Sequence, residues 1–183
     1  NEVYGRTTGQ AGPTLDLGEQ PKSLPRPNPQ GKVNPLLLAF ASGYTWIARG
    51  YAYDVKGLKE LIKEGIAHRG LAFLHVLQPC PTYNDLHTKE WFAPRLYRLE
   101  EEGYDPLVPP GLPPEALEAR MARFQQKALE WGERIPVGVF WKAELPTFEA
   151  RLKAYLPRYP EAYPARGPET PLDLEGLLQE FAL

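Results

Sequence analysis

Cysteine is nearly absent from this sequence, since Cys80 is the single thiol among 183 residues. One cysteine cannot close a disulfide within the chain, and disulfide-stabilised folds are typical of secreted proteins. This shortage excludes a disulfide scaffold, and we expect a cytoplasmic protein whose thiol stays reduced.

The sequence also lacks an excess of either charge, and it lacks long apolar runs. The formal net charge is −2 and the isoelectric point is about 6.0, so no strongly basic surface is available for nucleic acid or an acidic membrane. No apolar run approaches the roughly 20 residues that span a bilayer, and the opening NEVYGRTTGQ does not resemble a signal peptide. We therefore expect neither nucleic acid nor a membrane as a partner.

Proline, by contrast, is abundant, with 21 residues, about twice the usual share of roughly 5%. The hydrophobic content of 43% is enough for a core, and the length of 183 residues indicates one or at most two domains. Many rigid turns together with abundant Arg, Glu and Leu favour a thermophilic origin.

Residues 34–78 show a pattern of helix, strand, helix and strand. Asn34 can cap a helix whose first residue is Pro35, and the apolar residues 45–52 predict a buried strand. Residues 71–78 form a second continuous apolar run, which is typical of a central strand in a parallel sheet. This order predicts an α/β fold with a mostly parallel sheet and right-handed crossovers.

The helix between these strands has clear boundary signals. Asp54 can cap its start, residues 55–70 carry the helical pattern, and Gly70 is expected just after its last turn. Four apolar residues fall on one face of this helix: Leu58, Leu61, Ile62 and Ile66.

The remaining segments are less regular. Residues 1–14 read as a Gly/Thr-rich loop, and residues 15–34 read as an extended, Pro-rich excursion that packs on the surface or over a site. A short strand is expected from Ile135, and residues 171–183 predict a short docking helix. Residues 115–132 predict an amphipathic helix with an apolar face of Leu117, Met121, Phe124, Ala128 and Trp131.

The lone cysteine follows the second predicted strand. Ligands of open α/β sheets gather at the carboxyl ends of the strands, and the strand that ends at Gln78 is followed directly by Pro79, Cys80 and Pro81. The loop of residues 1–10 reads as the exit from a strand that lies upstream of Asn1. We therefore expect these two loops at the same edge of one sheet.

Three ordered segments carry a resemblance to a known family. NEVYGRTTGQAGPT, then residues 34–84, then IPVGVFWKAELPTFE resemble the β subunit of 2-oxoacid:ferredoxin oxidoreductases, most strongly up to Asn84. The resemblance implies a thiamin diphosphate-binding α/β fold. It implies that residues 1–105 form the C-terminal half of the thiamin diphosphate-binding domain. Residues 106–183 are then a Pro-rich C-terminal extension with helices, packed on that domain or on a partner subunit.

The resemblance also implies cofactor ligands in the first loop. The Asn1 side chain and the Val3 carbonyl would coordinate Mg²⁺, which prefers such oxygen ligands, while a carboxylate ligand would lie upstream of this sequence. Around the cofactor we expect Gly5, Thr7 and Gln10.

Arg6 and Thr8 are the residues of this loop that we expect to contact the substrate. They depart from the family pattern, in which Leu, Met or Asn and Lys or Gly are usual, and Gly12 stands where Ser is usual. Arg6 can pair with a substrate carboxylate or can make a structural ion pair.

Cys80 matches the fourth ligand of a [4Fe–4S] cluster in this family, with Gln78 in place of a Ser in the turn. Three further cysteines would come from sequence upstream of Asn1. Pro81 favours an extended backbone at Cys80, and four thiolates are the usual ligands of such a cluster. From composition alone, a small buried apolar residue is the commoner role of a free cysteine.

The function implied is oxidative decarboxylation of a 2-oxoacid to an acyl-CoA, with electrons passing through the cluster to ferredoxin. The implied partners are an α subunit or fused α/γ subunit, ferredoxin, the 2-oxoacid and CoA, and these 183 residues alone are expected to be inactive. Two alternatives are a non-oxidative thiamin diphosphate enzyme and a non-catalytic α/β docking subunit.

Other polar residues are expected to be structural. His68 lies in a last helical turn, where a cation suits the helix dipole, and His75 reads as a hydrogen-bonded core residue. His87 lies in a predicted loop with no indicated role, and Glu100–Glu102 read as a solvated run. No Ser-His-Asp or zinc-ligand spacing is present.

Overall fold

A computed structural model describes residues 2–156 and Gln179. The chain divides into two compact units, Asn1–Leu145 and Pro146–Leu183. In the second unit, helix α5 (Phe148–Tyr155) is capped by the Thr147 hydroxyl, which accepts from the Ala150 amide. The helix predicted over 171–183 falls outside the described residues apart from Gln179.

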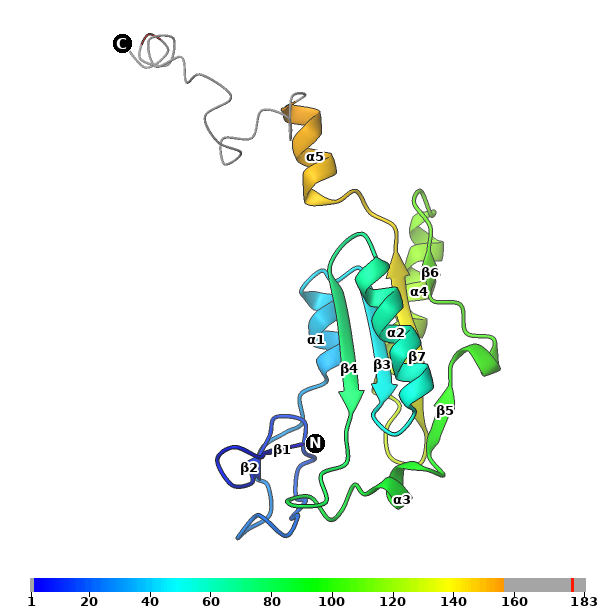
Figure 1. The fold of residues 1–183 in the computed structure, drawn as a ribbon. Helices are drawn as coiled ribbons and strands as arrows, with labels where there is room; N and C mark the ends of the chain where they lie inside the picture. The colour runs from blue at the N-terminus through cyan, green and yellow to red at the C-terminus, as the bar shows by residue number, and fades with distance from the viewer. Residues whose placement is uncertain (1, 157–178, 180–183) are drawn as a thin grey trace. The chain divides into compact units, whose positions relative to one another are not determined.

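The first unit is built on a mostly parallel sheet, as the sequence predicted (Figure 1). Its strands lie in the order β4-β3-β7-β5, and β6 also pairs with β7. The neighbours β3/β4, β5/β7 and β6/β7 are parallel, and β3/β7 is antiparallel. The strands are β3 (Trp46–Tyr51), β4 (Ala72–Leu77), β5 (Leu96–Arg98), β6 (Leu107–Val108) and β7 (Ile135–Ala143).

The strand predicted over residues 45–52 is confirmed, since every residue of β3 is buried. The position predicted for β4 is only partly right. It is parallel to β3, but it lies at the edge of the sheet formed by the described residues, with Ala72 and Val76 exposed. Its apolar sequence suits a strand covered on both sides, whereas the described part of the chain supplies one neighbouring strand.

Helix α1 (Pro35–Ala41) begins as predicted. The Asn34 side-chain oxygen accepts from the amides of Leu36 and Leu37, and Pro35 is the first helical residue. These bonds satisfy two of the amides that a helix start leaves without a partner.

Helix α2 (Val55–Ala67) begins at the predicted Asp54 cap, but it ends before Gly70 because His68 is already extended. Gly70 lies in the following turn with φ +152°. The predicted apolar face is only partly buried, since Ile62 is 44% and Ile66 81% exposed.

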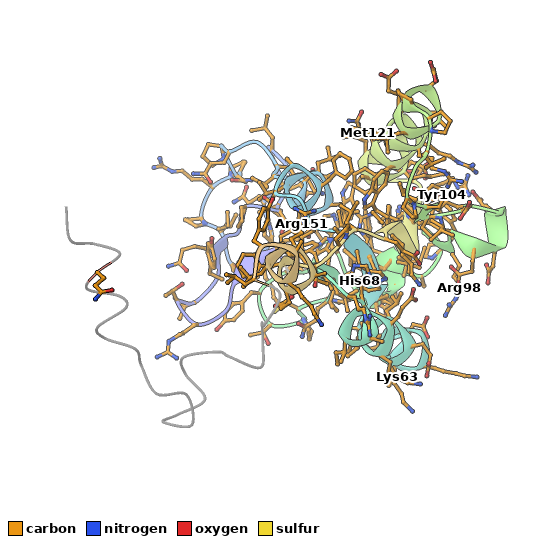
Figure 2. All side chains as sticks on the ribbon, turned by 90° about the horizontal axis from the view of Figure 1, so that it is seen from above. Lys63, His68, Arg98, Tyr104, Met121 and Arg151 are labelled. Atoms are coloured by element: carbon orange, nitrogen blue, oxygen red, sulfur yellow. The ribbon has the colours of Figure 1, made fainter. Side chains whose placement is uncertain are left out.

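Helices cover both faces of the sheet. Trp46 and Gly50 of β3 contact α2 on one face, and Ile47 packs on the other face with residues of α1 and of α4 (Pro114–Leu129). Figure 2 shows the labelled Lys63 of α2 and Met121 of α4 on opposite sides of the sheet. Phe124 and Ala128 of α4 are buried, while Trp131 lies beyond the end of this helix.

Residues 106–143, which we expected to belong to the C-terminal extension, supply β6, α4 and β7 to the first unit. Two short elements precede them, α3 (Lys89–Phe92) and the 3₁₀ helix η1 (Glu100–Glu102). The glutamates of η1 are exposed as predicted, but Glu102 pairs with Arg134 and Lys127. Within the residues described, no helix has both the length and the apolar character needed to cross a bilayer.

Candidate functional site

The N-terminal loop is folded as a small antiparallel hairpin of β1 (Val3–Tyr4) and β2 (Gln10–Ala11). The Gly12 amide donates to the Glu2 carbonyl over 2.7 Å, and the Gly9 amide donates to the Tyr4 carbonyl over 2.8 Å. Glu2 and Thr8 have φ values of +62° and +75°. Non-glycine residues rarely adopt this left-handed conformation, and such strain is common at functional sites.

The predicted cofactor and substrate residues have different environments in this hairpin. Val3 is buried and Gly5 is half-buried, whereas four residues are exposed: Arg6, Thr7, Thr8 and Gln10. Asn1 lies outside the described residues.

Local hydrogen bonds order the exposed part of the loop. The Thr7 hydroxyl donates to the side-chain oxygen of Gln10 over 2.5 Å, and the Thr8 hydroxyl donates to the Thr7 carbonyl over 2.6 Å. Arg6 makes no ion pair with any residue between 2 and 156, so the structural pairing considered for it is not found there.

Cys80 lies just after β4, in the turn that contains Pro79 and Pro81, and it is half-buried. Its carbonyl accepts from the Tyr83 amide over 3.3 Å and from the Asn84 amide over 2.9 Å, so the turn folds back on itself. Among the residues with described positions, no group of three or more His, Cys, Asp or Glu side chains is arranged to hold a metal ion.

The hairpin and the Cys80 turn contact one another, although β1 and β2 form a two-stranded sheet of their own. A Cβ atom at Gly5 would lie 3.7 Å from the Tyr83 ring. A Cβ atom at Gly9 would lie 2.5 Å from Ser23 Cβ and 3.1 Å from Tyr83 Cδ1. The close approach therefore depends on glycine at position 9.

The Pro-rich segment 15–34, which we expected on the surface or over a site, packs over this contact. The Lys22 ammonium donates to the Pro81 carbonyl over 2.7 Å, and the Lys22 amide donates to Asp85 over 2.7 Å. The Ser23 hydroxyl donates to the Gly9 carbonyl over 2.8 Å. One segment thus holds both loops.

Sequence reasoning missed one buried cluster between the loops. The Glu2 carboxylate is bonded to the imidazole of His87 and accepts from the Asn84 amide group over 3.2 Å. The other nitrogen of His87 lies 3.2 Å from Glu19. Burial raises the pKa of Glu19, while the nearby His87 opposes that shift. A buried role was hidden because His87 lies in a segment with no regular pattern.

A cavity of about 260 Å³ lies beside this cluster, lined in part by Glu2, Lys32, Arg49 and His75. Arg49 is only 2% exposed, its Nε donates to His75 Nδ1 over 3.3 Å, and it has no ion pair within residues 2–156. Burial lowers the pKa of Arg49 to about 10. Burial and the Arg49 charge lower the pKa of His75 to about 3, in keeping with the predicted hydrogen-bonded core role of His75.

Comparison with known proteins shows what this chain is similar to. Residues 80–156 match the family described as the C-terminal region of the pyruvate ferredoxin oxidoreductase β subunit. A 2-oxoacid:ferredoxin oxidoreductase subunit β from Sulfolobus sp. is 56% identical over 168 residues, which are 91% of this chain and 54% of that relative. Over this range the chain is similar to the β subunits of 2-oxoacid:ferredoxin oxidoreductases. The corresponding subunit of Saccharolobus solfataricus is 50% identical, over 98% of this chain and 60% of its own length.

A solved structure shows the same similarity. The 2-oxoglutarate:ferredoxin oxidoreductase of Magnetococcus marinus, with 2-oxoglutarate, coenzyme A and succinyl-CoA bound, aligns with a TM-score of 0.73 and 25% identity. The alignment covers 100% of this chain and 56% of that one. The chain thus spans about half the length of the family members that it matches.

Proposed function

We propose that this chain is part of the β subunit of an enzyme that oxidatively decarboxylates a 2-oxoacid to an acyl-CoA and passes the electrons to ferredoxin. The observation that carries the proposal is the contact between two loops that family resemblance had assigned to different cofactors. The hairpin at Gly5 and Gly9 lies against Tyr83 of the Cys80 turn. A reaction that passes electrons from one cofactor to another requires such neighbouring sites.

Thiamin diphosphate and Mg²⁺ fit the hairpin by the chemistry of its donors. Asn1 and the Val3 carbonyl offer the uncharged oxygen ligands that complete a Mg²⁺ shell beside a diphosphate. The left-handed conformation of Glu2 gives the backbone between them a sharp turn. Thiamin diphosphate, when bound, supplies the chemistry that releases CO₂ from a 2-oxoacid.

Other residues of the hairpin would surround the cofactor. Gly5 has no side chain, which allows close approach to its backbone. Thr7 and Gln10 are exposed and bonded to each other over 2.5 Å, so their polar groups are ordered at the surface that the cofactor would occupy.

A [4Fe–4S] cluster fits Cys80 as one ligand of four. The thiol is half-buried in a turn with two prolines, and thiolates are the ligands that such clusters use. The other three thiolates would come from the remaining length of the β subunit, since Cys80 is the single cysteine of this sequence.

Arg6 and Thr8 are the proposed substrate contacts. Arg6 is exposed, and its guanidinium can hold a carboxylate through two parallel hydrogen bonds. Residues 1–105 then belong to the thiamin diphosphate-binding domain, and residues 106–183 are a C-terminal extension that packs on that domain or on a partner subunit. An α or fused α/γ subunit, ferredoxin and CoA complete the assembly, in the cytoplasm of a thermophilic organism.

Iron analysis of the complete assembly tests this function. Cys80→Ala should lose the [4Fe–4S] iron and labile sulfide, measured under anaerobic conditions, and should retain thiamin diphosphate. Thr82→Ala, an exposed change in the same turn, is the matched control and should keep both. A full cluster and normal electron transfer to ferredoxin in Cys80→Ala would refute the role of Cys80.

A further inference from the structure

The cluster of Glu2, Asn84 and His87 connects two loops that are far apart in the sequence. We propose that it forms a clamp that fixes the backbone of Glu2 and Val3 relative to the Cys80 turn, with His87 as a positioning residue for both. The inference rests on the proposed function for the identity of the two sites. The clamp itself follows from the contacts below.

Glu2 is the centre of the clamp. One carboxylate oxygen is bonded both to Asn84 Nδ2, at 3.2 Å, and to His87 Nδ1. The side chain is 10% exposed, and a buried carboxylate is costly unless it is hydrogen-bonded. Because Glu2 is covalently joined to the backbone of Val3, these two bonds hold the proposed Mg²⁺ turn in place.

Asn84 connects the clamp to the cysteine. Its backbone amide donates to the Cys80 carbonyl over 2.9 Å. Its side-chain oxygen accepts from the amides of Leu86 and His87 over 3.0 and 3.2 Å. Asn84 therefore shapes the Cys80 turn and at the same time presents His87 toward Glu2.

His87 is held from three sides, and this is what makes it rigid. It is 4% exposed, and its two ring nitrogens face Glu2 and Glu19. Its ring packs on Trp91, with 4.1 Å between centroids. Removal of this imidazole would leave Glu2 with a single hydrogen-bonding partner among the described side chains of the clamp and with space into which it can turn.

The effect should appear in metal affinity. Residues that orient metal ligands without touching the metal usually change affinity by roughly 10–100-fold when they are replaced. In the complete enzyme we expect His87→Ala to weaken Mg²⁺ binding in the presence of thiamin diphosphate by about that factor. The reduction potential of the cluster should shift in the same variant, because the Cys80 turn is then connected to Glu2 only through Asn84.

The experiment combines calorimetric titration with Mg²⁺ and thiamin diphosphate and a redox titration of the cluster. Glu2→Gln is a second variant for the case that His87→Ala does not assemble. It keeps the shape of the side chain and should also weaken Mg²⁺ binding. His87→Gln retains a hydrogen-bond donor and should recover part of the affinity. The matched control is His68→Ala, whose imidazole is bonded to Thr45 over 2.8 Å before the start of β3, and it should bind Mg²⁺ within about twofold of the wild type.

The outcomes separate the clamp from the proposed function. The clamp alone would be overturned if His87→Ala or Glu2→Gln kept the wild-type Mg²⁺ affinity and cluster potential while Cys80→Ala lost its iron. Equal losses of Mg²⁺ affinity in His87→Ala and His68→Ala would also overturn the clamp, since the effect would then be a general destabilisation of the fold. Retention of the cluster in Cys80→Ala would overturn the proposed function.

Discussion

Gly9 is the position at which the hairpin, the Pro-rich segment and the Cys80 turn meet, and a methyl group there tests their packing. Its φ of +105° is one that L residues rarely adopt. An added Cβ would lie 2.5 Å from Ser23 Cβ and 3.1 Å from Tyr83 Cδ1. Ser23 cannot easily move away, because its hydroxyl donates to the Gly9 carbonyl over 2.8 Å. Gly9→Ala therefore combines backbone strain with a steric clash.

Two other glycines separate these effects. Gly18 has φ +83° with nothing within 4 Å of an added Cβ, and Gly31 has open space without such a φ. A left-handed conformation costs an L residue roughly 1–2 kcal/mol, and overpacking costs roughly 1–3 kcal/mol. We expect Gly9→Ala to lower the free energy of unfolding by roughly 2–5 kcal/mol and Gly18→Ala to lower it by roughly 1–2 kcal/mol. Gly31→Ala should be neutral or stabilising by less than about 1 kcal/mol.

Hydrogen exchange of the Gly12 amide measures the loss of stability in the hairpin itself. This amide donates to the Glu2 carbonyl over 2.7 Å, so its exchange reports opening of the hairpin. Urea unfolding of the same variants measures the stability of the remainder of the first unit. If Gly9→Ala increases exchange no more than Gly18→Ala does, the clash is absent and the contact between the three segments is refuted.

Two further predictions concern Arg6 and His75. In the complete enzyme, Arg6→Leu should raise KM for 2-oxoacids, because substrate binding loses roughly 1.5–3 kcal/mol of free energy. The affinity for thiamin diphosphate should stay unchanged. An unchanged KM across several 2-oxoacids would contradict a substrate contact. The pKa of His75 is lowered to about 3 in the folded chain, whereas a histidine of the unfolded chain has a pKa of about 6.5. Between these two pH values the unfolded chain binds a proton at His75 that the folded chain does not. The stability of the folded chain therefore falls as the pH decreases below about 6.5. Between pH 7 and 4.5 the wild type should lose roughly 2 kcal/mol more than His75→Gln in urea unfolding, and parallel pH profiles would contradict this.

Features governed by local sequence were predictable. The cap at Asn34 with Pro35 after it, the cap at Asp54 and the buried strand β3 all appear as expected. Each depends on neighbouring residues and on a continuous apolar run, so the information lies within a few positions.

Features that depend on distant neighbours were not predictable. The contact between Glu2 and His87 joins residues 85 positions apart, and neither residue has a periodic pattern around it. The exposure of Ile66, at 81%, and the edge position of β4 depend on what lies beside them, which the helical and apolar patterns do not specify. The pairing of β7 with β3 likewise joins residues that are far apart in the sequence, and the Pro-rich residues after 105 give no sign of it.

A crystal structure of the complete enzyme with thiamin diphosphate and Mg²⁺, with data collected on both sides of the iron absorption edge, would show which cofactor each of the two loops holds. We expect an iron-specific peak bonded to the Cys80 sulfur. We also expect Mg²⁺ at about 2.0–2.1 Å from the Val3 carbonyl, on the adjoining hairpin. A cluster held by four thiolates other than Cys80, or a Mg²⁺ ion with no ligand from the Asn1–Val3 turn, would contradict these expectations.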